Sequence, residues 1–533
     1  MANVQNSPLT MPESISESSQ SYGKPASRGG LPETIKVDGN KSLTLTPENL
    51  LLNDPTAKKA SRTCSFAGFG TSAPVTSSVP LYNVLWVELA DQRLTIDYAK
   101  YVAKHRVQAA QWNFTIADAD TADVRTWADT LLTKAYGPAK RCKRAKVLVN
   151  PHAGPGGAER KWRVDCEPLF KAARMPIDVT LTTYSGQAVE LSQELDVDAF
   201  DTIVTCSGDG LAYEVFNGLG NRPDAFSALQ KIAVSHIPCG SGNAMSCNLY
   251  GTFRPSLAAL AIIKGVETAL DLVSITQGDR RTLSFLSQAL GVVAESDLAT
   301  EHMRWMGGAR FTVGFLQRIF QKKCYPCDIA AKVEIEDKQE VKEHYKRMMS
   351  AASATNLGFA EAPKPESAEP GSSQAETRGL PPLKYGTIND DLPEGWELIP
   401  HNTLGNFYCG NMAYMAADAN FFSAAFANDG LMDLVLIDGD VSVSSQLNML
   451  LSVENGKFFD NPLVSYKKVT AYRIIPRDQE DGYISIDGEK VPFEPFQAEI
   501  HKSLGRVISK RGGYEAAGPM NWDKITIGNR IMA

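Results

Sequence analysis

The sequence predicts an α/β N-terminal lobe with a doubly wound parallel sheet, followed by a mostly antiparallel, β-sandwich-like C-terminal domain. Two observations lead to this fold class. Between residues 145 and 275, apolar strand-like runs alternate with helical patterns, which is typical of a parallel sheet with crossover helices. After about residue 282 the pattern becomes rich in strands, for example NFYCGNMAYMA and KKVTAYRIIP.

Four apolar runs are expected to form the parallel sheet. They are AKVLVN (145–150), IDVTLTTYS (177–185), DTIVTC (201–206) and KIAVSHI (231–237). Helical segments such as QAVELSQEL separate them. In doubly wound sheets, ligands bind at the carboxyl ends of the strands. The Gly-rich turns that follow three of these strands are therefore the candidate ligand site.

Composition limits the class of protein. The chain has 533 residues, 43% hydrophobic and 22% charged, which is enough for more than one domain. Its net charge of −7 argues against a general nucleic-acid binder. No run of about 18 apolar residues predicts a membrane-spanning helix, and the N-terminus lacks a signal-peptide pattern. We therefore expect a soluble cytoplasmic protein.

Nine cysteines are scattered along the chain, as expected of reduced intracellular thiols. Cys324 and Cys327 form a CxxC motif, but no second pair accompanies them. A structural zinc site needs four ligands, so these two are predicted to be ordinary strand cysteines. Cys64 is an isolated thiol that either accepts a reversible acyl chain or is an ordinary free cysteine.

Three regions are expected to lie outside the packed domains. Residues 1–78 are rich in Ser, Pro, Thr and Gly and are predicted to be largely disordered. An Ala-, Pro-, Ser- and Glu-rich stretch predicts a disordered insertion at about 345–390. Residues 516–533 are expected to be a C-terminal tail.

Residues 79–138 combine strand-like segments with one amphipathic helix that contains Trp127. This pattern indicates either a small pleckstrin-homology-like lipid-binding module or an extension of the next domain. The following KRCKRAK, residues 140–146, holds five basic side chains in seven positions. It is predicted either to bind anionic lipid headgroups or to form a solvated linker edge. The remaining domains are expected at 139–281 and 282–515.

The first Gly-rich turn lies in VLVNPHAGPGG, residues 147–157. Gly154, Gly156 and Gly157 let the backbone approach a ligand closely. The helix that follows directs free N–H groups at this space, which suits a phosphate. The turn lacks the GxxxxGK[ST] pattern of a P-loop. Alone, it is equally consistent with a plain strand–turn–helix connection.

The second turn, SGDG, is more specific, because it follows a buried strand and places Asp209 between two glycines. Asp209 is either the N-cap of the next helix or a functional carboxylate. Such a carboxylate accepts a proton from a hydroxyl nucleophile or helps to hold Mg²⁺ near a triphosphate.

The third turn, PCGSGNAM, spans residues 238–245 and supplies donors for a phosphate or an adenine. Met245 stands where the third glycine of a dinucleotide-binding GxGxxG belongs. A nicotinamide-dependent reductase is therefore disfavoured.

Together, NPHAGPGG, SGDGLAYEVFNGL and PCGSGNAM resemble the diacylglycerol-kinase-type catalytic domain of lipid kinases. Within that group the chain is similar to the sphingosine (sphingoid long-chain base) kinases, fungal ones among them. The resemblance covers about 140–330 and 400–510, and it implies ATP and Mg²⁺ as cofactors. It also implies a nucleotide site made of Asn150, Gly154, Gly156, Gly157, Thr182, Ser207, Gly208, Gly210, Gly240, Ser241, Gly242 and Asn243.

The resemblance also assigns roles to four acidic positions. Asp209 takes the place of the catalytic base, which removes the proton from the primary hydroxyl of the lipid. Glu214 matches an acid near the nucleotide and the metal. Asp487, Gly488 and Glu489 match a second signature, in which Glu489 contacts ribose or water around the metal. No particular metal ligand is predicted.

In the β domain, the resemblance implies that Ser287 is a polar partner of the lipid headgroup and that Asp297 meets the ammonium group of the substrate. Arg304 and Arg310 match arginines that reach the phosphates. A buried carboxylate needs a partner, so the alternative for Asp297 is a salt bridge to Arg304. The apolar segments around residues 311–320 and 420–428 either line an acyl pocket or belong to the core.

These observations favour a kinase of sphingosine, sphinganine or phytosphingosine. A ceramide or diacylglycerol kinase, and a non-catalytic lipid-binding protein on the same fold, are the alternatives. Because the substrate is membrane-resident, we expect peripheral association with intracellular membranes such as the ER, Golgi or plasma membrane. No nucleic-acid partner is expected, and the sequence predicts neither the oligomeric state nor the preferred base.

Overall fold

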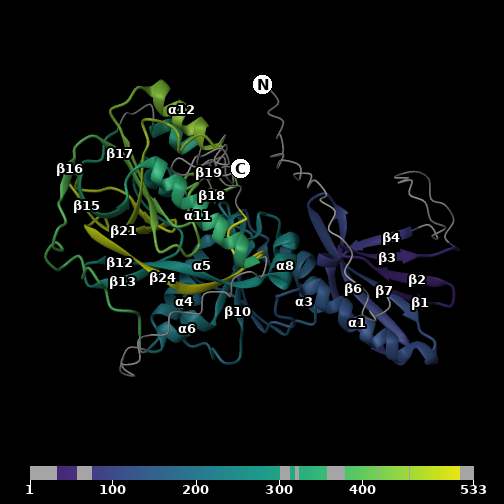
Figure 1. Cartoon of the computed structure of the whole chain (residues 1–533). Coiled ribbons are helices and arrows are strands. Elements are labelled where there is room, and N and C mark those ends of the chain that lie inside the picture. The colour runs from purple at the N-terminus through teal and green to yellow at the C-terminus, as the bar shows by residue number, and fades with distance from the viewer. Residues whose placement is uncertain are drawn as a thin grey trace.

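Figure 1 shows a computed structural model of the chain, which describes residues 33–56, 75–299, 313–318, 323–356, 379–417, 419–454 and 456–515. An N-terminal module lies at one end, and an α/β lobe and a β domain form the rest. Fifteen strands of the latter two parts belong to one sheet. Within these described ranges, no helix has both the length and the apolar character needed to cross a membrane.

The N-terminal module consists of two antiparallel sheets, ordered β1-β2-β3-β4 and β5-β6-β7, and one helix. Both sheets and the helix contribute to one hydrophobic core, in which Trp127 is 1% exposed. The elements are β1 Thr34–Val37, β2 Lys41–Leu45, β3 Asn49–Asn53, β4 Val75–Pro80, β5 Val84–Ala90, β6 Arg93–Ala103, β7 Arg106–Thr115 and α1 Thr121–Tyr136. Whether this module is pleckstrin-homology-like stays a prediction.

The first sheet corrects the expectation that residues 1–78 are disordered. Its strands bury alternating apolar side chains, including Ile35, Val37, Leu43 and Leu45. Each strand is short and flanked by polar residues, so its local signal is weak, and only pairing with its neighbours stabilises it. Cys64 lies outside the described residues.

The α/β lobe confirms the predicted parallel sheet, with the order β11-β10-β8-β9. Helices pack on its faces, and all four strands end at the same edge. The elements are β8 Ala145–Val149, α2 Ala158–Lys161, η3 Trp162–Cys166, α3 Glu167–Ala172, β9 Ile177–Leu181, α4 Gln187–Gln193, β10 Thr202–Ser207, α5 Asp209–Gly220, α6 Ala225–Lys231, β11 Ala233–Pro238, α7 Ala244–Tyr250 and α8 Pro255–Lys264.

The β domain is antiparallel, as predicted, with β22, β14, β17, β20, β21 and β24 in order. The elements are β12 Val266–Gln277, β13 Arg280–Ser284, β14 Ser287–Gly291, α9 Val292–Leu298, β15 Cys327–Ile335, α11 Lys338–Asn356, β16 Ile399–His401, β17 Leu404–Gly410, β18 Tyr414–Ala416, β19 Ala419–Asn420, β20 Met432–Asp438, α12 Val443–Glu454, β21 Ser465–Pro476, β22 Ile484–Ile486, β23 Glu489–Val491 and β24 Phe496–Ser509.

Strand β24 joins the two parts into one sheet. It pairs antiparallel with β12 and β21, and parallel with β11 of the α/β lobe. Strand β12 lies before the expected boundary at residue 282 and pairs with β13 and β24. Strand β13 follows directly along the chain, whereas β24 comes from its far end, which a local pattern does not reveal.

Two parts of the expected disordered insertion at 345–390 have a defined structure. Helix α11 runs to Asn356, and residues 379–390 are described. The backbone N–H groups of Lys384 and Tyr385 donate to the Glu499 carboxylate at 2.8 and 2.9 Å. Arg473 donates to the carbonyl oxygen of Thr387 at 3.0 Å. These polar contacts order a segment that has little apolar surface of its own.

The basic cluster at 140–146 forms contacts within the fold, while Lys140, Arg141 and Arg144 stay exposed, so both expectations for it stay predictions. Lys140 and Arg144 pair with Asp201 at 3.0 and 2.9 Å, and Lys146 pairs with Asp178. Lys143 is buried and donates to two carbonyl oxygens at the end of α8. These charges therefore hold the lobe together.

Lys264 links the N-terminal module to the α/β lobe. Its Nζ donates to the Val84 carbonyl oxygen at 2.9 Å and lies 3.6 Å from the centre of the Tyr136 ring. The side chain is buried, and no carboxylate of the described residues forms an ion pair with it. Burial, assisted by the nearby Lys143, lowers the pKa of Lys264 to about 6.

This pKa predicts that stability rises with pH. Between about pH 6 and its ordinary pKa of 10.5, Lys264 is neutral when folded and protonated when unfolded, so the unfolded chain binds more protons. We expect Lys264→Met to flatten the rise and to increase the free energy of unfolding at neutral pH, as measured by urea denaturation across a pH series. Lys134→Met, on the exposed face of α1, is the control. A slope that Lys264→Met leaves unaltered would contradict the prediction.

Candidate functional site

A cavity of about 660 Å³ opens at the carboxyl ends of β8, β10 and β11 and continues into the β domain. It brings together most of the residues that the sequence predicts for the site. The lining includes Asn150, Gly154, Thr182, Ser207, Gly208, Asp209, Gly210, Glu214, Gly240, Ser241, Gly242, Ser287, Asp297, Asp487, Gly488 and Glu489.

The Gly-rich turns pack directly on one another, and this packing requires glycine. A Cβ on Gly240 would lie 2.3 Å from the Gly208 Cα atom. A Cβ on Gly154 would lie 2.7 Å from the Cys239 carbonyl oxygen, and Gly154 also has a φ of +55°. These contacts explain why the three turns form a single surface rather than three separate loops.

Asp209 is the first residue of α5, and Gly208 stands at the N-cap position. The Asp209 carboxylate therefore does not cap its own helix. Instead, its two oxygens accept the N–H groups of Ala244 and Met245, at 2.9 and 3.0 Å, at the start of α7. The N-cap expectation is thus wrong for α5, and Asp209 joins the second turn to the third.

Glu214 lies more than one turn further along α5, and its side chain reaches the start of α4. Its Oε2 accepts the N–H of Ala188 at 3.1 Å, in the first turn of α4. Burial raises the pKa of Glu214, although backbone donors from Gly186 and Ala188 oppose that shift. Two carboxylates of α5 therefore fix two other helices around the cavity.

Asp487 and Glu489 belong to the β22–β23 turn and have different surroundings. Asp487 is 2% exposed and accepts hydrogen bonds from the Ser284 hydroxyl and the N–H groups of Phe285, Leu286 and Ser287. Burial nevertheless raises its pKa to about 6. Its contacts hold the turn in position.

Glu489 faces the second Gly-rich turn. A Cβ on Gly210 would lie 2.6 Å from Glu489 Oε1, so this carboxylate comes close to Asp209. The β22–β23 turn therefore brings an acid of the β domain to the mouth of the parallel sheet.

The lipid-side residues of the prediction also meet at the cavity. Ser287 and Asp297 line it together with Tyr408. Burial, together with the nearby Asp297 charge, raises the pKa of Tyr408. The Asp297 Oδ2 lies beside Gly488, at 3.7 Å from the position of a Cβ there. A negative charge is thus available between the β22–β23 turn and the apolar end of the cavity.

Three predicted residues do not line the cavity. Gly156 and Gly157 lie further along the first turn. Asn243 closes the third turn on itself, because its side chain accepts the N–H of Gly240 and donates to the Gly240 carbonyl oxygen, both at 2.9 Å. Arg304 and Arg310 lie outside the described residues.

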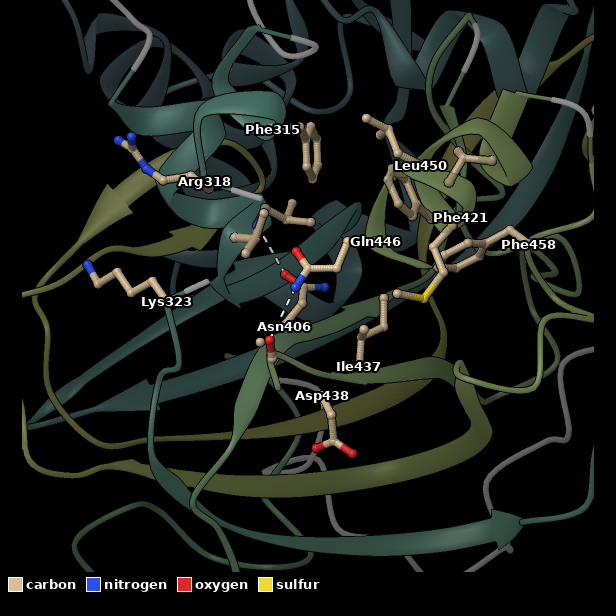
Figure 2. Close-up of a pocket in the computed structure, with 16 residues that line it drawn as sticks. Phe315, Arg318, Lys323, Asn406, Phe421, Ile437, Asp438, Gln446, Leu450 and Phe458 are labelled. Carbon is tan, nitrogen blue, oxygen red and sulfur yellow. Dashed lines mark hydrogen bonds between the residues drawn. The ribbon is translucent and has the colours of Figure 1, made fainter. Parts of the chain in front are cut away.

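The cavity continues into an apolar pocket of about 70 Å³, shown in Figure 2. The two share Val293, Phe315, Phe421, Leu450 and Val453 as lining residues. Phe315 and Phe421 come from the two segments for which the sequence predicted either an acyl pocket or core. Phe422, beside them, is fully buried core. The two segments therefore contribute both to the pocket and to the core.

The polar side chains of the smaller pocket have partners within the protein. Arg318 and Lys323 pair with the Glu295 carboxylate at 3.0 and 3.1 Å. Asn406 accepts the N–H of Val293 at 3.0 Å, and Gln446 donates to the Gly439 carbonyl oxygen at 3.1 Å. Asn406 and Gln446 lie among the apolar side chains (Figure 2), and the rest of the lining is mostly hydrocarbon, which suits an alkyl chain.

Sequence analysis missed several residues of the cavity: His152, Tyr184, Tyr408, Leu447 and Leu451. His152 and Tyr184 stand two residues after predicted site positions, which was an available signal. Leu447 and Leu451 are four residues apart on α12, and no motif marks them.

Metal and cysteine chemistry add little to the described site. The described residues contain no group of three His, Cys, Asp or Glu side chains placed to hold a metal ion. The eight cysteines in these residues are all free. Cys327 is buried in β15, as predicted, whereas Cys324 lies before the strand, so the prediction of two strand cysteines is only half confirmed.

Two known families match the N-terminal module and the α/β lobe separately. The family described as "Diacylglycerol kinase catalytic domain" matches residues 144–275. A second family, described as a domain of unknown function (DUF7493), matches residues 33–137. The α/β lobe with its three Gly-rich turns is thus a catalytic domain of the diacylglycerol kinase type.

Two yeast relatives narrow the assignment. "Sphingoid long chain base kinase 4" of Schizosaccharomyces pombe is 34% identical over 440 residues, which cover 82% of this chain and 89% of the relative. "Sphingoid long chain base kinase 5" of Saccharomyces cerevisiae is 37% identical over 428 residues, which cover 72% of this chain and 62% of the relative. The chain belongs to the family of sphingoid long-chain base kinases.

Among solved structures, a diacylglycerol kinase from Bacillus anthracis is 15% identical to the chain. The match covers 69% of this chain and 97% of the solved chain, with a TM-score of 0.43.

The close packing of the turns predicts that Gly240→Ala damages the site. The new Cβ would collide with backbone of Gly208, which has no flexible side chain to move aside. We expect the free energy of unfolding to fall by about 1–3 kcal/mol. We also expect ATP to bind more weakly, as measured by calorimetry. Gly513→Ala, which has open space around its Cβ, is the control. ATP binding equal to that of the unsubstituted protein would contradict the prediction.

Proposed function

We propose that this protein transfers the γ-phosphoryl group of ATP to the primary hydroxyl of a sphingoid long-chain base, giving the base 1-phosphate and ADP. The observation that carries this proposal is the single cavity, in which three Gly-rich turns at one end meet an apolar pocket at the other. A nucleotide suits the first end and an alkyl chain the second. Asp209 lines the same cavity.

In this mechanism, Asp209 accepts the proton of the attacking hydroxyl. Its two hydrogen bonds to the start of α7 fix the orientation of the carboxylate and leave further lone pairs on both oxygens. The same bonds support the ionised form, since amide N–H groups donate to it. Holding the base in place before the substrate arrives lowers the entropic cost of reaching the reactive arrangement.

ATP fits the glycine end, because backbone there approaches closely and Gly240, Ser241 and Gly242 line the space. Glu489 and Glu214 also line it, and such carboxylates suit Mg²⁺, which keeps several waters and uses substrate phosphates as ligands. When bound, the ion would neutralise charge on the phosphates. Arg304 and Arg310 are proposed to contribute positive charge there.

The lipid headgroup is proposed to lie between Ser287 and Asp297. A sphingoid base carries an ammonium group, which pairs with the Asp297 carboxylate, whereas ceramide and diacylglycerol carry no cation. The polar residues of the cavity and the apolar pocket beyond them would thus receive the headgroup and the chain in that order. A non-catalytic lipid binder would not need Asp209 turned toward the cavity.

The substrate resides in a membrane, so the protein must reach it from the surface. We propose peripheral association with intracellular membranes from the cytoplasmic side. Leu447 and Leu451 support this, since both line the cavity and are 39% and 52% exposed. They mark the side of the β domain from which an alkyl chain enters.

Replacement of Asp209 tests the chemical step. We expect Asp209→Asn to lower turnover of sphinganine by about 10²–10⁴-fold, because the hydroxyl loses its proton acceptor. The assay follows transfer of radiolabelled phosphate from ATP into the lipid extract. Asp178→Asn, at an exposed salt bridge on β9, is the matched control. Comparable turnover in Asp209→Asn and the control would reject Asp209 as the base.

Replacement of Asp297 tests the substrate class. We expect Asp297→Asn to lower kcat/KM for sphinganine and phytosphingosine by about 10–100-fold, because a charge-assisted hydrogen bond is lost. Any turnover of ceramide or diacylglycerol should stay unchanged, since neither has an ammonium group. The measurement compares all four lipids in one assay. An equal effect on lipids with and without the amine would contradict the pairing.

A further inference from the structure

The β6–β7 hairpin of the N-terminal module ends in an unusual tip. All seven residues from Lys100 to Arg106 are exposed, although β6 buries Leu94, Ile96 and Tyr98 before them. Tyr101 and Val102 are 53% and 47% exposed. Adjacent strand residues point to opposite faces. Both faces of the tip are therefore open to solvent, at the end of the hairpin that reaches the α/β lobe.

The charge of the tip is opposite to that of the protein as a whole. Lys100, Lys104 and His105 surround the two apolar side chains, whereas the chain carries a net charge of −7. In the described part of the chain, neither Lys100 nor Lys104 forms an ion pair. Arg106, which pairs with Ala103 to close the turn, forms an ion pair with Asp165 at 2.7 Å and so anchors this end of the hairpin to the α/β lobe.

A second exposed aromatic lies beside the hairpin. The N–H of Val107 donates to the Ser256 hydroxyl at 3.1 Å, and Val107 pairs with Tyr101 across the hairpin. Ser256 lies three residues after Phe253, which is 43% exposed. The Arg254 guanidinium lies 4.7 Å from the centre of the Phe253 ring.

The C-terminal end of β24 adds a further cation to this side. The Lys510 ammonium lies 6.0 Å from the centre of the Tyr82 ring, and Asn83, next to Tyr82, donates to the Ala99 carbonyl oxygen of β6 at 2.7 Å. The nearby Glu515 carboxylate is already paired with Arg511 at 2.6 Å. We call this basic–aromatic surface the hairpin surface; it comprises Lys100, Tyr101, Val102, Lys104, Phe253, Arg254 and Lys510.

From these contacts we infer that the hairpin surface docks the protein on an anionic lipid bilayer, with the hairpin tip inserted at the headgroup level. Lysine and arginine side chains bind anionic lipids, and their long stems reach from the headgroups past apolar groups. Tyrosine is favoured at this depth, because its ring is apolar and its hydroxyl is polar. The exposed aliphatic Val102 favours a bilayer over a nucleic acid, since nucleic acids are bound through charge and through aromatic rings on which bases stack.

This inference goes beyond the proposed kinase reaction and gives the N-terminal module a role. The module is joined to the α/β lobe through Lys264, Arg106 and Val107, so a docked hairpin would hold the lobe at the membrane. Vesicle binding needs neither ATP nor turnover. A protein that fails to bind vesicles is therefore distinguishable from one that fails to phosphorylate the lipid.

The test is flotation of the full-length protein with phosphatidylcholine vesicles, with and without phosphatidylserine. We expect binding only when phosphatidylserine is present. The double variant Lys100→Glu/Lys104→Glu should bind at least about tenfold more weakly, because two attractive charges become repulsive. Lys36→Glu/Lys134→Glu, with the same charge change elsewhere in the module, should bind like the unsubstituted protein.

A second variant tests insertion of the tip. Tyr101→Ser/Val102→Ser keeps all charges, and we expect it to bind severalfold more weakly than the unsubstituted protein. Phosphorylation of lipid in detergent micelles should be unchanged in both hairpin variants, which shows that they fold. No binding of the unsubstituted protein to phosphatidylserine vesicles would overturn the inference. Undiminished binding of either hairpin variant would do the same.

Discussion

The hydrogen bonds from Ala244 and Met245 to the Asp209 carboxylate are the constraint on which the site depends. They place a carboxylate of the second Gly-rich turn at the start of α7, where the backbone has unpaired N–H groups. The contact between Gly208 and Gly240 lies directly beside them and leaves no room for a Cβ. Charge and close packing thus act at the same point to hold the two turns together.

Helix α5 extends this constraint to the rest of the molecule. Its Glu214 fixes the start of α4, and its Asn217 exchanges two hydrogen bonds of 2.9 Å with the backbone of Leu283 in β13. One helix therefore connects the parallel sheet, α4, α7 and the β domain. Its contacts therefore hold together elements that lie far apart in the sequence.

The cavity exists because the two parts of the molecule share a sheet. Strand β24 pairs with β11, β12 and β21, so the Gly-rich end and the apolar end of the cavity keep a fixed relation. Asp487 adds a second connection, since it gathers donors from the β13–β14 segment and holds the turn that carries Glu489. A buried carboxylate that accepts several hydrogen bonds holds the surrounding backbone in one arrangement.

Much of the fold followed from local patterns. Strong alternation of strands and helices between residues 145 and 275 predicted the parallel sheet, because β8, β10 and β11 are largely buried on both faces and therefore rich in apolar residues, whereas the edge strand β9 is partly exposed. The four short strands at 34–80 were missed, since each has only two or three apolar residues. The ion pairs of the basic run at 140–146 were not predicted, because its carboxylate partners Asp178 and Asp201 come from other strands or turns.

By itself, the sequence determined the three Gly-rich turns, the carboxylate between two glycines and the family to which the chain belongs. Spacing and residue type suffice for these, since each turn is built from neighbours along the chain. Only the tertiary structure decided that Asp209 binds the start of α7 rather than its own helix, and that Leu447 and Leu451 border the cavity. It also showed the β6–β7 tip to be uncovered. These features depend on contacts between distant segments, and residue order alone does not specify which surfaces will meet.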